Sequence, residues 1–319
     1  MIEETSEDAF RIDAPLFQPM HYDDIEVPSL FKLRGRYYLI GSIREDVKVH
    51  YWWADAPRGP YRNFSDNDLL PKGNYAARIS REGHRFLVWS FFYKGLTTKG
   101  RHLMAPPKEL VVDDNGELHL QSFRGFNDIA RESLGLRELT PLTPLLGNPD
   151  GWSERTGSGC AASCTSGFEA FLLQGEYENF MLSGELTIED SGKHGLVFRI
   201  NEDGDGYYLA VDPSKGTVQL RAWGQRPRGN PEEEFAYEEV QSADYVPTTG
   251  PLSFRLIAYE QYLEFSLNGY VLLTAADDHY ARGRAGFYVG DARVRVDRPV
   301  VKRLSASEDE NFPVHIVDL

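Results

Sequence analysis

Short apolar runs that alternate with turn residues dominate the first third of the chain. Leu30–Leu33 and Tyr37–Ser42 flank the pair Arg34-Gly35, which is typical of a hairpin turn. Comparable runs recur at intervals of roughly 8–12 residues, without a helical repeat between them. This spacing predicts antiparallel strands and is typical of sandwiches, barrels and propellers. The other runs that we expect to form strands are Lys48–Trp53, Asn74–Ile79, Arg85–Phe92, Leu110–Asp113 and Glu117–Gln121.

The alternation stops between residues 126 and 170. Asn127–Leu139 has room for one short helix, and the prolines and glycines that follow indicate irregular chain. We therefore place a domain boundary near residue 140, with a first β-region over residues 1–140 and a connector over residues 141–177.

Alternating apolar and polar positions return at residue 178. Phe180–Ile188 and Leu252–Ala258 have the pattern of strands with one wet face, and Asn268-Gly269 is a specific hairpin signal. The pattern predicts a β-sandwich over residues 178–305. Residues 306–319 are rich in acidic side chains, and we expect them to form a tail outside the sandwich.

Composition narrows the choice of partners. The chain has 319 residues, of which 41% are apolar and 26% charged, and its net charge is −15. A surface this acidic repels phosphate backbones and anionic lipids, so we expect no nucleic-acid or membrane partner. Neutral sugars carry no such penalty. The chain has no apolar run of membrane-spanning length and no signal peptide at its start, so we expect a cytoplasmic protein.

Cysteine and histidine give no metal signature. Cys160 and Cys164 are too few for a zinc site, and we expect two small residues in a turn, with a local disulfide as the alternative. Residues 201–212 have the spacing of a calcium loop, but their place between two strands favours a polar hairpin turn. We expect neither a metal nor another cofactor.

The segment Asp24–Phe31 (DIEVPSLF) resembles the E-C-P-x-L-F segment of family 32 glycoside hydrolases, the group of invertases, levanases and inulinases. The resemblance continues in order through Lys32–Ser42 (KLRGRYYLIGS), Gly73–Arg78 (GNYAAR) and Ala105–Leu110 (APPKEL), and it covers roughly residues 15–304. It implies an all-β fold: about two blades of a five-bladed-type propeller within residues 1–140, then a concanavalin-like β-sandwich. Family 43 enzymes, which use similar blades, are the nearest alternative.

Two motifs of family 32 are missing. The family carries its nucleophilic aspartate in a W-M-N-D-P segment and a second aspartate in an R-D-P segment, and this sequence has neither. The resemblance therefore corresponds to the C-terminal part of such enzymes, without the N-terminal blades.

Retaining glycoside hydrolysis needs two carboxyl groups, one as nucleophile and one as acid/base. The resemblance implies that Glu26 is the acid/base. Asp24 lies two residues away, where it would share a strand face with Glu26, and Asp23 or Asp24 is a weak candidate for the missing nucleophile. Because a sugar site needs polar groups and aromatic faces, we take Tyr22, Tyr75 and Arg78, together with Asp24, as candidate substrate-binding residues.

Two functions remain open. One is a glycoside hydrolase-like protein acting on fructose-containing sugars, in which a homodimer or a second chain with the missing blades supplies the nucleophile. The other is a non-catalytic carbohydrate-binding or interaction protein built on the sandwich. The expected ligand is a disaccharide or oligosaccharide in the first case. Apolar residues such as Phe86 and Val88 are expected on a lateral blade face that another element must cover.

Overall fold

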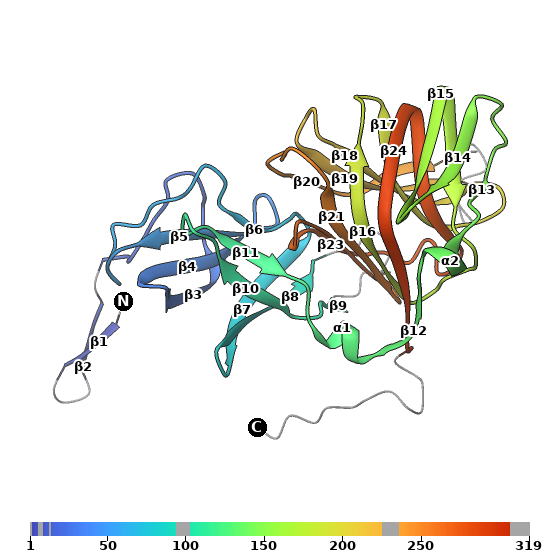
Figure 1. The fold of residues 1–319 in the computed structure, drawn as a ribbon. Helices are drawn as coiled ribbons and strands as arrows, with labels where there is room; N and C mark the ends of the chain where they lie inside the picture. The colour runs from blue at the N-terminus through green and yellow to red at the C-terminus, as the bar shows by residue number, and fades with distance from the viewer. Residues whose placement is uncertain (1, 6–8, 13, 94–102, 225–235, 307–319) are drawn as a thin grey trace.

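The computed structural model describes residues 2–5, 9–12, 14–93, 103–224 and 236–306. Strands dominate these residues, which confirms the all-β prediction. Figure 1 shows two small sheets side by side and a large sheet next to the second of them. A separate hairpin of β1 (Ile2–Thr5) and β2 (Ala9–Ile12) lies near the N-terminus. No helix in the described part of the chain is long and apolar enough to span a membrane.

The first small sheet is an antiparallel meander of four strands. Its order is β3 (Glu26–Leu33), β4 (Arg36–Ile43), β5 (Lys48–Ala54) and β6 (Asp68–Leu70). One face packs on the second small sheet. On the other face, Trp52 is buried beneath side chains such as Phe17 and Ile25 from the segment before β3.

The second small sheet has five strands. It consists of β7 (Asn74–Glu82), β8 (Arg85–Phe92), β10 (Lys108–Val112) and β11 (Leu118–Gln121), with β9 (Leu103–Met104) paired to β8.

Both faces of this second sheet are covered. Phe86 and Val88 pack between the two small sheets, and Phe92 packs against Tyr262 of the large sheet. The elements that cover these residues thus belong to this chain: the first small sheet covers Phe86 and Val88, and the large sheet covers Phe92.

The large sheet begins earlier in the chain than its alternation suggests. Residues 141–177, expected as a connector, contain three strands of this sheet: β13 (Thr143–Pro144), β14 (Gly151–Thr156) and β15 (Gly159–Leu172). The single helix expected at Asn127–Leu139 is instead two one-turn helices, α1 (Gly125–Asp128) and α2 (Leu136–Leu139), on either side of β12 (Ala130–Leu134).

Small residues explain why β15 was missed. A Cβ atom on Gly159 would lie 2.1 Å from the carbonyl oxygen of Val296, so the neighbouring backbone approaches where a side chain would stand. Cys160 and Cys164 are buried in this strand as free thiols, which contradicts both the turn and the local disulfide. Close packing here requires small side chains rather than the β-branched residues that mark strands in a sequence.

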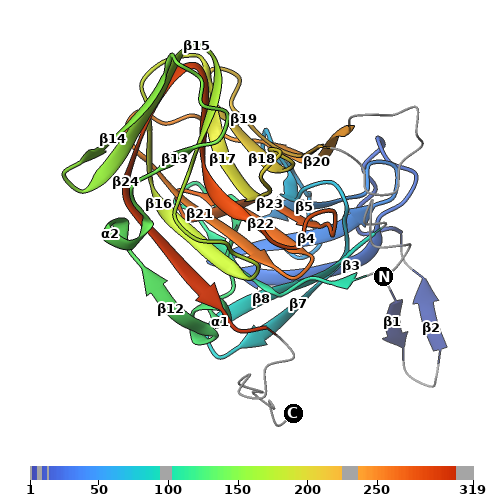
Figure 2. The ribbon, with the colours of Figure 1, turned by 90° about the vertical axis from the view of Figure 1, so that its right-hand side faces the viewer.

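The remaining strands of the large sheet wrap around one apolar core. They are β16 (Phe180–Ile188), β17 (Lys193–Ile200), β18 (Gly206–Asp212), β19 (Thr217–Gly224), β20 (Ala236–Asp244), β21 (Leu252–Tyr259), β22 (Tyr262–Leu267), β23 (Tyr270–Ala276) and β24 (Arg284–Leu304). Figure 2 shows β24 as a long orange-red strand that runs from the top of the sheet down to α1. It pairs with β12, β15, β16 and β17, so this one strand joins the two halves of the sheet.

The turn between β10 and β11 locks the two small sheets together. Arg36 Nη1 donates to the carbonyl oxygen of Asn115 at 2.8 Å, and the Tyr38 hydroxyl donates to that of Gly116 at 2.8 Å. Gly116 has φ +90°, and a Cβ atom there would lie 1.8 Å from Arg36 Nη1.

We predict that Gly116→Ala destabilises the fold more than Gly250→Ala. Both glycines have φ near +90° to +100°, but nothing lies within 4 Å of a Cβ atom on Gly250. The shared backbone strain costs roughly 1–2 kcal/mol, and displacing Arg36 from its hydrogen bond adds about 1 kcal/mol. Urea denaturation measures both free energies of unfolding, and equal losses in the two variants would contradict the prediction.

Candidate functional site

The first strand of each small sheet has a β-bulge near its start, and the two bulges are equivalent. In β3, Val27 and Pro28 lie opposite the single residue Gly41 of β4, because the pairing shifts between Glu26 and Ser29. In β7, the pairing with β8 shifts in the same way between Tyr75 and Arg78.

The residue after each candidate has a left-handed backbone. Val27 has φ +55° and Ala76 has φ +51°, in a region that costs a residue with a Cβ atom roughly 1–2 kcal/mol. Bulges redirect side chains and are frequent beside active sites. Here they turn Glu26 and Tyr75 toward each other.

Glu26 and Tyr75 form a direct hydrogen bond. The Tyr75 hydroxyl donates to Glu26 Oε2 at 2.8 Å, and Arg44 Nη1 lies 3.7 Å from Glu26 Oε1. Burial and the neighbouring Glu26 carboxylate raise the pKa of Tyr75 well above its ordinary value. Tyr75 therefore keeps its proton and acts as a fixed donor.

Arg44 connects Asp24 to the same site. Its Nη2 atom lies 2.7 Å from Asp24 Oδ2, so one guanidinium lies between two carboxylates. The other oxygen of Asp24, Oδ1, is buried and accepts no hydrogen bond from the described residues. Sequence reasoning missed Arg44, although the β3–β4 hairpin places the end of β4 beside the start of β3.

Arg78 supports the bulge in β3. Its Nη1 atom donates to the carbonyl oxygen of Pro28 at 3.0 Å and lies 3.5 Å from Ser29 Oγ. The backbone N–H of Ala76 donates to Ser42 Oγ at 2.8 Å. These contacts tie the two bulges to each other across the sheets, so they fix the position of Glu26 relative to Tyr75.

Tyr22 belongs to a different cluster. Its ring lies 5.4 Å from that of His50, measured between centroids, on the outer face of the first small sheet. His50 Nε2 lies 2.7 Å from Asp46 Oδ2, and Nδ1 lies 3.0 Å from Asp68 Oδ1 in an ion-pair contact that is poorly directed for a hydrogen bond. Burial lowers the pKa of His50, but Asp68 and Asp46 outweigh it, so the pKa is raised.

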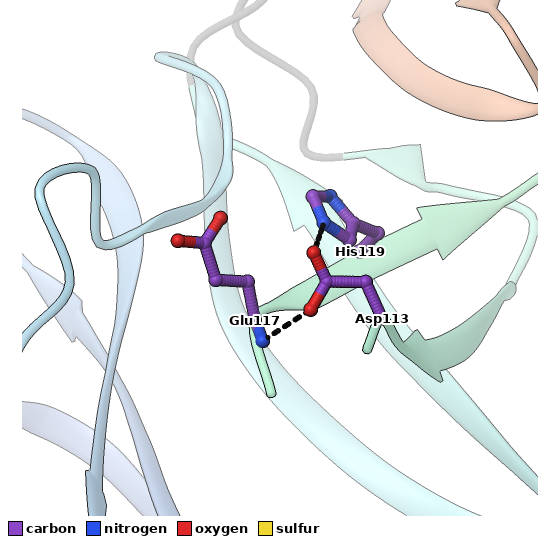
Figure 3. Close-up of side chains that lie close together, drawn as sticks. All are labelled: Asp113, Glu117 and His119. Atoms are coloured by element: carbon purple, nitrogen blue, oxygen red, sulfur yellow. Dashed lines mark hydrogen bonds and ion pairs between the residues drawn. The ribbon is translucent and has the colours of Figure 1, made fainter. Parts of the chain in front are cut away.

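One group of possible metal ligands occurs among the described residues. Asp113, Glu117 and His119 offer ligand atoms within 4.8 Å of one another. Asp113 Oδ1 accepts the N–H of Glu117 at 2.8 Å, and Figure 3 shows the Glu117 carboxylate pointing away from the Asp113–His119 contact. The His119 ring stacks on Tyr270 with 4.2 Å between centroids. These contacts describe a hydrogen-bonded turn.

Comparisons with known proteins show a likeness in fold. No protein-family model matches the sequence, and neither does any curated protein. The exo-inulinase of Aspergillus awamori superimposes with a TM-score of 0.59 and 14% identity, over 91% of this chain and 59% of that one. The fold is like that of family 32 glycoside hydrolases.

Two further solved structures agree. A fructan 1-exohydrolase IIa from Cichorium intybus, in complex with 1-kestose, gives a TM-score of 0.57 at 12% identity, over 85% of this chain and 57% of that one. The family 32 β-fructofuranosidase of Bombyx mori gives 0.55 at 14% identity, over 88% and 54%. The present chain thus spans between 54% and 59% of the length of these three proteins.

We predict that His50→Gln costs more stability at pH 6 than at pH 8.5. A histidine whose pKa is raised on folding stabilises the fold fully below its unfolded pKa, and this stabilisation is lost as the pH rises through the folded pKa. Chemical denaturation at both pH values measures the difference from the wild type. His84→Gln, in an exposed turn, serves as the control. A difference that stays constant with pH would show that His50 is not charged in the fold.

Proposed function

We propose that this chain carries the acid/base side of a β-fructosidase-type site, with Glu26 as the acid/base and Tyr75 as the residue that positions it. The observation that supports this most directly is the Tyr75–Glu26 hydrogen bond between two equivalent, strained bulges. The likeness in fold to enzymes named for fructosides and fructans adds to it, as does the resemblance of Asp24–Phe31 to the family's glutamate segment.

The two carboxyl oxygens of Glu26 have different contacts and therefore different proposed roles. Oε2 accepts a hydrogen bond from the Tyr75 hydroxyl, so a proton on the Glu26 carboxyl group belongs on Oε1, the oxygen on the Arg44 side. In the proposed reaction Oε1 protonates the leaving oxygen of the glycosidic bond and later takes a proton from water. Asp24 and Arg44 bind sugar hydroxyl groups as acceptor and donor, and Arg78 maintains the bulge.

The nucleophile comes from outside this chain in our proposal. Asp24 is the other carboxylate held by Arg44, and its Oδ2 atom is already engaged there. We infer that the two small sheets are blades of a five-bladed-type propeller and that the large sheet is the β-sandwich that accompanies it. A second chain with the remaining blades would pack over the segment that covers the outer face of the first small sheet, around the half-buried Phe17 and Ile25.

A second candidate function is saccharide binding without catalysis. The missing N-D-P and R-D-P segments favour it, because a retaining enzyme without its nucleophile has no covalent route. In this case the same Asp24–Arg44–Glu26 group binds a fructose-containing disaccharide or oligosaccharide without cleaving it.

We predict that the pure chain releases no fructose from sucrose, inulin or levan above the rate of a blank. Reducing-sugar assays at high protein concentration measure the release. If fructose appears and Glu26→Gln abolishes it, the chain is complete by itself and the composite site is wrong. Asp24→Asn then tests whether Asp24 is the nucleophile.

We predict that Asp24→Asn weakens binding of 1-kestose about tenfold, since a hydrogen bond to a charged group contributes roughly 1.5–3 kcal/mol. Asp55→Asn, an exposed change of the same kind directly after β5, leaves the affinity unchanged. Isothermal calorimetry measures both. If the wild type binds no fructoside, or if Asp24→Asn binds as well as the wild type, the assignment of the sugar site is wrong.

A further inference from the structure

A cavity lies between the second small sheet and the large sheet. It encloses about 530 Å³, and none of the Glu26-site residues lines it. The small-sheet side contributes residues from β10, β11 and α1, and the large-sheet side contributes residues from β16, β21, β22 and β24. The residues used below are Glu109, Arg124, Ser183, Glu185, Arg255, Ser266 and Arg298.

The strand pairing places a polar row on the large-sheet wall. Ser183 of β16 pairs with Arg255 of β21, which pairs with Ser266 of β22. The neighbours Leu182 and Leu256 lie in the core, so alternation along each strand directs the row to the opposite face. A guanidinium flanked by two hydroxyl groups therefore faces the cavity.

The charged side chains around the cavity do not balance. Glu109 is paired with Arg85 at 3.2 Å and with Arg124 at 2.7 Å, and Glu185 is paired with Arg298. Arg255 is only partly exposed, and its guanidinium makes no hydrogen bond or ion pair with the described residues. Both acidic groups are thus neutralised, and Arg255 is left as an uncompensated cation in a chain with a net charge of −15.

A bulge in β24 holds a second guanidinium at the cavity. Arg298 and Pro299 lie opposite Gly184 of β16, because the pairing shifts between Ser183 and Glu185. Arg298 has φ +50°, and its backbone N–H donates to the carbonyl oxygen of Ser158 at 2.8 Å. The pairing with β16 and the bond to Ser158 therefore hold the strained backbone in place. They direct the Arg298 side chain toward Glu185 and the cavity.

We propose that this cavity binds a small hydroxyl-rich molecule that carries an oxyanion, such as a sugar phosphate or a sugar acid. Arg255 takes the oxyanion through its planar pair of N–H donors, and the hydroxyl groups of Ser183 and Ser266 serve the ligand's own hydroxyl groups. Partial burial of an unpaired cation is unfavourable, and a bound oxyanion removes that cost. This site goes beyond the proposed function and does not depend on it.

The stability of the free protein provides one test. If Arg255 is kept for a ligand, its replacement by a neutral side chain leaves the melting temperature unchanged or raises it. Arg255→Gln is the variant, and Arg137→Gln, an exposed change of the same charge on α2, is the control. A large loss of stability in Arg255→Gln alone would show a structural role and overturn the proposal.

Calorimetric titration tests the ligand class with four probes: glucose 6-phosphate, glucuronate, inorganic phosphate and glucose. We expect glucose 6-phosphate or glucuronate to bind at least tenfold more tightly than glucose, and whichever binds tighter identifies the phosphate or the carboxylate as the source of the oxyanion. Inorganic phosphate should bind more weakly than glucose 6-phosphate, because it lacks the sugar hydroxyl groups.

The variants locate the binding. Arg255→Gln should weaken the anionic sugar by about tenfold or more, and Ser183→Ala by a few-fold without changing a charge. Arg137→Gln and Glu26→Gln should bind as the wild type does, which separates this cavity from the Glu26 site. Equal affinity for glucose and the anionic sugars, no binding of any probe, or unchanged affinity in Arg255→Gln would each overturn the proposal.

Discussion

The second small sheet is buried on both faces, and this double burial determines where both candidate sites lie. Val88 and Leu110 pack on the first small sheet, while Phe92 and Phe126 of α1 pack on the large sheet. A sheet that is packed on both faces cannot shift without opening voids on both sides. This packing fixes the position of β7 relative to β3 on one face. That position brings Tyr75 to Glu26. On the other face the same packing leaves the 530 Å³ cavity.

The seam between the second small sheet and the large sheet is partly polar. Lys108 is buried, and burial lowers its pKa to about 8 in spite of the nearby charge of Glu264. Its ammonium lies 5.3 Å from the centre of the Tyr262 ring. Glu264 in turn accepts hydrogen bonds from Ser122 and Tyr262. Polar partners of this kind admit one alignment, whereas an apolar seam tolerates several, so the network specifies how the two sheets meet.

Much of the fold could be predicted because it is written in local patterns. Alternation and turn residues located both small sheets, and the Asn268-Gly269 pair lies between β22 and β23 as expected. The strand β15 could not be predicted in this way, because its small residues are required by the close approach of the β24 backbone and not by any local preference. The resemblance singled out Glu26 and Tyr75, which the structure brings together. It grouped Tyr22 with them, although that ring packs on His50, because nearness in sequence says little about the face on which a loop residue lands.

Left-handed residues other than glycine fall into two classes in this structure. Arg34, Glu260 and Asn268 lie in hairpin turns, where such a backbone is routine. Val27, Ala76 and Arg298 lie at strand bulges, where regular pairing was available and was not used. Arg199 and Asp291 also lie at bulges. The Arg199 guanidinium donates to three backbone carbonyl groups, and the Asp291 carboxylate accepts the N–H of Gly167, so their strain is compensated within the fold.

At Val27, Ala76 and Arg298 the strained backbone lies beside a candidate site. The strain at Val27 and Ala76 leads to Glu26, whose Oε1 atom has only a distant arginine beside it, and to the unpartnered Oδ1 atom of Asp24. The strain at Arg298 leads to a cavity wall that contains the uncompensated Arg255. Strain alone does not make a site, since Arg199 is a structural anchor. Strain beside polar groups without partners, as at Asp24 and at Arg255, is what we expect a fold to retain for a ligand.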